Sequence, residues 1–265
     1  MKFKILSVTN LIVTLLLIYW NYLSNTGFID GKTIGSVSGK YDSLFTPAGY
    51  AFSIWGIIFL GLIVFGVFAV YLAFTKPDKY HHVEKAIPLM IGLNLLNGAW
   101  VYYWLTEDIL MSVIIMFLMF SWFLRIIIQL KMELWDAPCK VIALIWWPID
   151  LYFGWIMVAF VANVSSYLNY TGFSMGLQER TWVIIMIGVV TLINFLLVQK
   201  RNLREVGLVA VWALVAIAVR HWNSEIAIAY PAAGAAAFLL VTIQLHAIKN
   251  KATMPFVKKK WSEVI

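Results

Sequence analysis

Residues 147–163 read WPIDLYFGWIMVAFVAN. The stretch is apolar enough to form most of a membrane-spanning helix, for which about 20 residues are needed. It also contains a carboxylate, a proline and several large aromatic residues. Burying the carboxylate of Asp150 in hydrocarbon is costly, so such a residue is first considered as a functional candidate. The stretch therefore predicts a helical membrane fold and shows where to look for a site.

The composition of the whole chain also indicates a membrane protein. Of its 265 residues, 62% are hydrophobic and 12% are charged, and the mean hydropathy is +0.85. Soluble domains have about 45–50% apolar and about 25% charged residues. The single cysteine, Cys139, excludes an internal disulfide framework. The net charge of +7 comes from basic residues between apolar runs, which indicates orientation in a membrane rather than nucleic-acid binding.

Apolar segments recur along the chain, so we expect an all-α, polytopic transmembrane bundle of about eight helices. The segments are 5–24, 47–74, 86–106, 109–130, 140–163, 181–199, 206–221 and 226–248. The seventh is the weakest, because its uncharged core is short and it spans only if Arg220 snorkels to the interface. The chain shows no internal repeat, which argues against an inverted-repeat transporter.

The basic residues predict how the chain is oriented. With the N-terminus in the cytoplasm, only four of the 20 Lys and Arg residues fall outside, namely Lys32, Lys40, Arg180 and Arg220. This distribution is the one that the positive-inside rule expects. Both termini are therefore predicted to be cytoplasmic, and the short loops favour a bacterial inner membrane. The basic tail, 249–265, is expected to lie on the anionic inner leaflet.

Two longer external segments are expected, at 25–46 and 164–180, and both are rich in Gly, Ser, Asn and Tyr. The first is long enough to fold back over the mouth of a cavity as a lid. A flexible loop is the alternative, because loops of this length are either functional or disordered.

The segment 86–106 carries Asn97, Trp100 and Trp104 at three- and four-residue spacing, so they share one helix face. A face that combines an amide with flat rings suits a planar apolar ligand. The alternative is that Asn97 bonds a neighbouring helix and that the aromatic residues pack or anchor the helix.

The segment 47–74 opens with a proline, which we expect in the first turn of a helix. Thr46 is expected to cap that turn. Trp55 lies one to two turns deeper, where an interface anchor is less expected, and is therefore a candidate to line a pocket.

The segment 140–163 carries Tyr152, Trp155, Ala159 and Asn163 at a 3–4–4 spacing, which places them on one face. Ala159 leaves room beside Trp155 for another helix or a ligand. Asp150 lies roughly 140° around the helix from Trp155, off this face. Three interpretations of Asp150 stay open: a polar tie to another helix, a ligand-binding group, and a proton-relay or catalytic acid.

Familiar enzyme signatures do not occur. The chain has no Gly-rich phosphate loop, nucleophile elbow or His-Glu-x-x-His pattern, and its histidines do not have metal-ligand spacing. We therefore predict no catalytic residues, no metal site and no cofactor. No acidic or histidine partner is expected near Asp150 at comparable depth.

Motifs on three of the segments resemble those of the tryptophan-rich sensory protein family, also known as the translocator protein (peripheral benzodiazepine receptor) family. The matching residues are Pro47, Trp55 and Phe59; Asn97, Trp100, Tyr102 and Tyr103; and Tyr152, Trp155, Ala159 and Asn163. The chain departs from the family pattern at Pro148, which stands four residues before Tyr152 instead of directly before it. Residues 25–46 also lack the tryptophan that the family usually has there.

The resemblance implies a five-helix membrane domain at 1–170, followed here by three additional helices at 171–248 and the basic tail at 249–265. It implies a pocket, closed by the first external segment, that binds porphyrins, sterols or similar planar apolar molecules in a protein that often forms dimers. The implied pocket residues are Trp55, Asn97, Trp100, Tyr152, Trp155 and Ala159. Asp150 and Asn163 join this set as ligand-binding candidates from their own positions.

We therefore expect an integral membrane binding or sensory protein for a tetrapyrrole- or sterol-like ligand. Its other partners are expected to be membrane lipids, with no nucleic acid. A proton-coupled small-molecule transporter that uses Asp150 is the alternative, and a membrane lipid hydrolase is the third hypothesis.

Overall fold

The structure is a computed structural model that describes residues 1–76, 81–134, 137–173 and 176–250. All the named secondary-structure elements in these residues are helices. The long helices are α1 (Lys2–Ser24), α3 (Ile54–Thr75), α4 (His81–Leu105), α5 (Ile109–Gln129), α7 (Trp147–Thr171), α8 (Glu179–Arg201), α9 (Arg204–His221) and α10 (Ile226–Lys249). They correspond in order to the segments predicted from the sequence. The polytopic helical bundle is confirmed.

Six helical stretches in the described residues are long and apolar enough to cross a membrane. They are Lys2–Ser24, Gly49–Thr75, Ile109–Gln129, Cys139–Thr171, Glu179–Arg201 and Ile226–Lys249. The two long helices outside this set are α4 and α9. Helix α9 has only 18 residues, and three of them, Arg204, Glu205 and Arg220, are charged. Helix α9 is the segment that the sequence marked as weakest.

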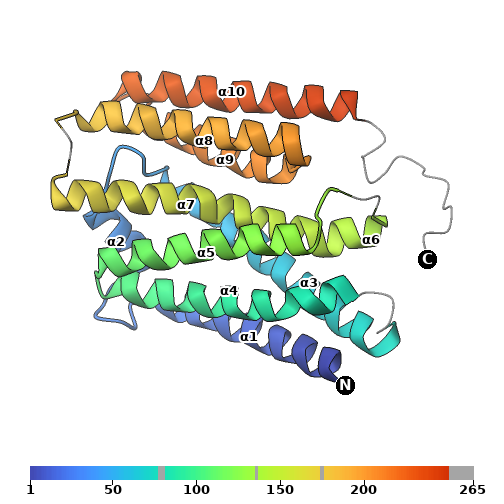
Figure 1. The fold of residues 1–265 in the computed structure, drawn as a ribbon. Coiled ribbons are helices and arrows are strands. Elements are labelled where there is room, and N and C mark those ends of the chain that lie inside the picture. The colour runs from blue at the N-terminus through green and yellow to red at the C-terminus, as the bar shows by residue number, and fades with distance from the viewer. Residues whose placement is uncertain (77–80, 135–136, 174–175, 251–265) are drawn as a thin grey trace.

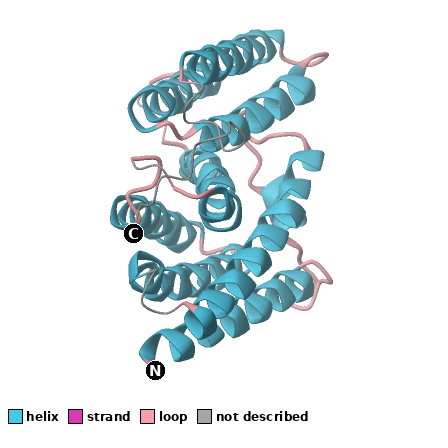
Figure 2. Cartoon of the chain, turned by 90° about the vertical axis from the view of Figure 1, so that its right-hand side faces the viewer, coloured by secondary structure: helices cyan, strands magenta, loops and turns pink. Residues whose placement is uncertain are grey.

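The helices lie side by side in two groups (Figure 1). Helices α1, α3, α4, α5 and α7 pack into one bundle, and α9 joins α8 and α10 to the outer side of α7. Figure 2 shows the same layers along the helix axes. We call the end of the molecule with the short helix α2 (Ile34–Lys40) the α2 end, and the end with α6 (Cys139–Val141) the α6 end.

Helix α7 is the central element, and a glycine allows α9 to approach it. A Cβ atom on Gly154 would lie 2.8 Å from Cβ of Val209 and 3.1 Å from the carbonyl oxygen of Val206. Real Cβ atoms essentially never approach another atom to 2.8 Å, so only glycine fits at this position. The backbone of α7 therefore lies directly against α9. Most α7 side chains between Pro148 and Val158 are consequently buried.

The start of α7 is shaped by Pro148. Proline has no N–H and its ring clashes with the carbonyl four residues earlier, so a regular α-helical turn is unfavourable here. The chain instead forms a π-helical turn, η2 (Ile142–Trp146), directly before α7. Such turns often occur at functional positions. Gly61 of α3 packs against the proline, since its Cβ would lie 3.3 Å from the Pro148 Cβ.

Two local predictions were wrong. The expected external loop 164–180 is mostly helix, because α7 continues to Thr171 and ends at Gly172, whose φ of +68° suits glycine. Thr46 does not cap a helix that starts at Pro47. The helix starts with a 3₁₀ turn, η1 (Gly49–Ser53), and the Thr46 hydroxyl instead accepts a hydrogen bond from the Ser43 N–H at 3.3 Å. Most of the predicted basic tail lies outside the described residues.

Candidate ligand-binding site

A cavity of about 50 Å³ lies at the α2 end, between the first external segment and helices α3, α4, α5 and α7. The residues that line it are Ile34, Ser38, Thr46, Pro47, Phe52, Trp55, Trp100, Trp104, Met116, Trp155, Val158, Ala159, Ala162, Asn163 and Ser166. Four of these are tryptophans that come from three different helices. The cavity is therefore an apolar, aromatic space with a few polar groups, as small-molecule sites generally are.

The tryptophans form two walls of fixed geometry. On one side, the rings of Trp55 and Trp155 meet edge to face with centroids 6.5 Å apart, and Phe52 packs on Trp155 at 5.7 Å. On the other side, Trp100 and Trp104 stack at 5.8 Å with 18° between their planes. Aromatic pairs at such distances stabilise one another beyond the area they bury. Both walls are thus apolar and aromatic, with rings that are held by contacts with one another.

The main polar group of the cavity is the Asn163 amide, which is held by a hydrogen-bond chain. The Trp100 indole N–H donates to Asn163 Oδ1 at 3.0 Å, and Asn163 Nδ2 donates to Ser112 Oγ at 3.0 Å. The Ser112 hydroxyl in turn donates to the Ile109 carbonyl at 2.7 Å. An amide oxygen accepts two bonds and an amide nitrogen donates two. Asn163 is therefore oriented and still has capacity on each side for a ligand.

Asn97 and Tyr152 lie behind the aromatic wall and do not line the cavity. Asn97 Nδ2 donates to the Tyr152 hydroxyl at 2.6 Å, and both side chains are fully buried. The Tyr152 ring contacts Trp55 with centroids 5.8 Å apart. Asn97 thus bonds a neighbouring helix, as the alternative interpretation of the sequence held, and the pair positions Trp55.

Asp150 does not line the cavity; it lies in the first turn of α7 at the α6 end, five residues before the cavity residue Trp155, and is fully buried. It is not alone there. One carboxylate oxygen of Glu133, one of Asp150 and one of Glu205 all lie within 4.8 Å of one another. The expectation that no acidic residue accompanies Asp150 was wrong, because tertiary packing brings together residues that are far apart in the sequence.

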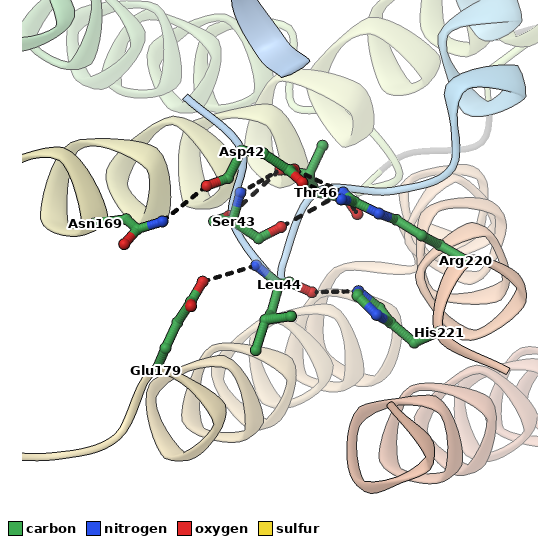
Figure 3. Close-up of polar contacts among 8 residues, drawn as sticks. All are labelled: Asp42, Ser43, Leu44, Thr46, Asn169, Glu179, Arg220 and His221. Carbon is green, nitrogen blue, oxygen red and sulfur yellow. Dashed lines mark hydrogen bonds and ion pairs between the residues drawn. The ribbon is translucent and has the colours of Figure 1, made fainter. Parts of the chain in front are cut away.

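The first external segment forms one wall of the cavity, and helix α9 holds it in place (Figure 3). Arg220, in the last turn of α9, forms a two-pronged ion pair with Asp42, in which Nη1 and Oδ1 are 2.8 Å apart. Its Nη1 also donates to the Thr46 carbonyl at 2.9 Å. Arg220, which the sequence required to snorkel to the interface, thus lies at the helix end and ties the segment to the additional helices.

Two further helices bind the same segment through its backbone. The Leu44 N–H donates to Glu179 Oε1 of α8 at 2.9 Å, and Nε2 of His221 lies 2.9 Å from the Leu44 carbonyl oxygen. Asn169 Nδ2 of α7 donates to the Asp42 carbonyl at 2.8 Å. The segment next to the cavity is therefore fixed by α7, α8 and α9 together.

The opposite edge of the segment is bound by Glu107, in the turn between α4 and α5. Glu107 pairs with Lys32 at 2.9 Å and with Lys40, and it accepts a hydrogen bond from the Tyr41 hydroxyl at 2.6 Å. The hydrogen bonds from Lys40, Tyr41 and Lys32, in that order, lower the pKa of Glu107 from about 4.5 to about 2. Glu107 is therefore charged at neutral pH. On the cavity side, the Trp104 indole N–H donates to the Ile34 carbonyl at 3.2 Å.

The structure divides the predicted site residues into three groups. Trp55, Trp100, Trp155, Ala159 and Asn163 line the cavity, whereas Asn97 and Tyr152 support it from behind and Asp150 lies at the α6 end. Sequence reasoning missed Phe52, Met116 and Ser112. Phe52 precedes Trp55 by three residues and so shares its face, which is a signal that was present; Met116 and Ser112 carry no such signal.

A sequence model of the TSPO-like protein family matches residues 7–245. The chain belongs to this family. The match confirms the resemblance noted from the three motifs and, together with the apolar helices, establishes an integral membrane protein. It also runs through α8 and α9 into α10, beyond the residues that the motifs covered. A search of curated proteins finds no match, and neither does a search of solved structures.

Proposed function

We propose that this TSPO-like protein binds a planar apolar ligand, of the tetrapyrrole or sterol kind, in the cavity at the α2 end and acts as a receptor or sensor for it. The tryptophan walls are the observation that supports this most directly, because indole rings from three helices can stack on, or meet the edge of, a planar ligand. The Asn163 amide, held by Trp100 and Ser112, would orient a polar edge of that ligand.

Ligand binding requires the cavity to enlarge. Its volume of about 50 Å³ is well below the roughly 300–1,000 Å³ of typical ligand pockets. Long packed helices, α3, α4, α5 and α7, form most of the lining, and the remaining wall is the segment that carries Ile34, Ser38 and Thr46. That segment contains only the short helix α2, and side chains of neighbouring helices, such as Arg220 and Glu179, hold it in place. It is therefore the wall most able to move. We infer that it acts as a lid, and that the structure is the closed state.

The proposed setting is a bacterial inner membrane with both termini in the cytoplasm, which places the lid on the outer side. A homodimer is the proposed oligomeric form. The transporter alternative, which uses Asp150, stays a prediction, because Asp150 lies at the α6 end and does not line the cavity. Binding without transport is thus the simpler proposal.

The test is a titration of detergent-solubilised protein with protoporphyrin IX, followed by quenching of tryptophan fluorescence. Saturable binding in the micromolar range is expected, and Trp155→Phe should weaken it several-fold because it removes part of one wall. Trp122→Phe is the matched control: Trp122 lies on α5, is partly buried and does not line the cavity. The same affinity in Trp155→Phe and the wild type would contradict the proposed site, and no saturable binding of porphyrin or of a sterol probe would contradict the function.

A further inference from the structure

Three acidic side chains from distant parts of the chain converge at the α6 end. Glu133 lies in the turn after α5, Asp150 in the first turn of α7 and Glu205 in the first turn of α9. One carboxylate oxygen from each lies within 4.8 Å of the other two. The proposed ligand cavity does not use this cluster, because none of its three members lines the cavity.

Asp150 is the member of the cluster that calls for an explanation. Its side chain is fully buried, and neither of its oxygens has a hydrogen-bond partner within the described residues. Its electrostatic neighbours are Glu133 and Glu205, which are themselves acidic. Oε2 of Glu205 is likewise buried and without a hydrogen-bond partner in the described part of the chain. Removing a charged carboxylate from water without any partner is strongly unfavourable, and buried charges are normally paired or coordinate a metal.

We propose that Glu133, Asp150 and Glu205 bind a divalent metal cation of the hard class that prefers oxygen ligands. Carboxylates are the ligands that Ca²⁺, Mg²⁺ and Mn²⁺ favour. A bound cation supplies the positive charge that Asp150 lacks, while the buried Arg204 interacts electrostatically with Glu205. The site joins α5, α7 and α9, so an ion here would tie the additional helices to the first bundle.

The arrangement of the oxygens favours a cation of calcium size. Each oxygen lies within 4.8 Å of the other two, and three oxygens at that limit would lie about 2.8 Å from an ion between them. Small side-chain movements therefore bring them to the Ca–O distance of about 2.3–2.6 Å, in the flexible geometry that Ca²⁺ accepts. Mg²⁺ requires about 2.0–2.1 Å and near-octahedral geometry, so around it the oxygens would have to move further or leave positions to water.

The probe for the test is Mn²⁺, added to the full-length protein after treatment with a chelator and followed by the loss of the free-ion electron paramagnetic resonance signal. One Mn²⁺ per chain is expected, displaced by Ca²⁺ at lower concentration than by Mg²⁺. Asp150→Asn and Glu205→Gln should weaken binding at least tenfold. Glu107→Gln is the matched control, since it removes a carboxylate at the α2 end, and should leave Mn²⁺ binding unchanged.

If Asp150→Asn or Glu205→Gln folds poorly, a further variant and the melting temperature still test the proposal. Glu133 lies in a turn and is partly exposed, so Glu133→Gln should fold and still bind Mn²⁺ several-fold more weakly. Ca²⁺ should raise the melting temperature of the wild type and not that of Asp150→Asn. Wild-type protein that binds no Mn²⁺ at millimolar concentration would overturn the proposal and show that a proton alone neutralises Asp150. Unchanged binding in Asp150→Asn would overturn it as well.

Discussion

The two ends of the molecule differ in the partners of their acidic side chains. At the α2 end, Asp42 is paired with Arg220, and Glu107 with Lys32, Lys40 and Tyr41. At the α6 end, Asp150 is surrounded by other acidic groups and receives no hydrogen bond from the described residues. The chain itself supplies the counter-charges of Asp42 and Glu107, whereas the charge of Asp150 is balanced, in our proposal, by a bound cation.

The difference indicates what each end is built to do. Bonds between the chain's own groups hold the segment over the cavity, and they form and break without any other molecule, as a lid requires. The acidic cluster, in our proposal, is completed by a cation from outside. Helix α9 connects the two ends, because it carries Glu205 in its first turn and Arg220 in its last. Changes in α9 therefore test both ends together.

The largest effect is expected from Gly154→Ala, which separates α7 from α9. The added Cβ would lie 2.8 Å from Val209 Cβ, so α9 must shift, and overpacking of this kind costs about 1–3 kcal/mol. The melting temperature should fall, and both protoporphyrin and Mn²⁺ binding should weaken. Gly188→Ala is the control: its Cβ meets nothing within 4 Å, so the substitution should be neutral or stabilise α8 by up to about 1 kcal/mol. A Gly154→Ala variant with unchanged melting and binding would show that α9 does not link the ends.

A smaller effect, confined to the α2 end, is expected from Arg220→Met. It leaves Asp42 and the Thr46 carbonyl without their donor and should cost about 1–2 kcal/mol, because the ion pair is partly exposed. A looser lid should speed protoporphyrin association several-fold in stopped-flow fluorescence, and Mn²⁺ binding should not change. Arg180→Met, which removes a more exposed pair with Glu225, is the control and should alter neither. If Arg220→Met melts earlier but binds porphyrin at the wild-type rate, the segment is not the lid.

The smallest effect is expected when acid protonates Glu107, which binds the edge of the first external segment. Because folding lowers the pKa of Glu107 to about 2, its bonds to Lys40, Tyr41 and Lys32 contribute fully above its ordinary pKa. Their contribution should decline as the pH falls from about 4.5 towards 2. A fluorescent probe on Gly39→Cys, in a Cys139→Ser background, should report a change of environment in that range. The change should be absent when Glu107→Gln is added; a transition that persists there would come from another group.

The sequence predicted some of the site well for reasons that are local. Trp155, Ala159 and Asn163 line the cavity because helical spacing alone puts them on one face. Trp55 and Trp100 could be selected because large aromatic residues inside a membrane-spanning segment either pack between helices or line a pocket. Ser112 could not be found in this way. Its role is to accept a hydrogen bond from the Asn163 amide, and the sequence does not show that the two residues are neighbours. Tyr152 and Asn97 share helix faces with pocket residues, and only their packing against each other reveals that they support the wall.

Composition and periodicity by themselves determined that this chain is a polytopic helical membrane protein, because apolar runs of spanning length have few other stable forms. The motifs also determined the family. Only the tertiary structure decided that Arg220 secures a segment near Asp42 and that Glu133, Asp150 and Glu205 meet at the α6 end. Such pairings depend on how helices far apart in the sequence approach one another. Here that approach is made through a glycine, Gly154, whose partners on α9 lie more than 50 residues along the chain.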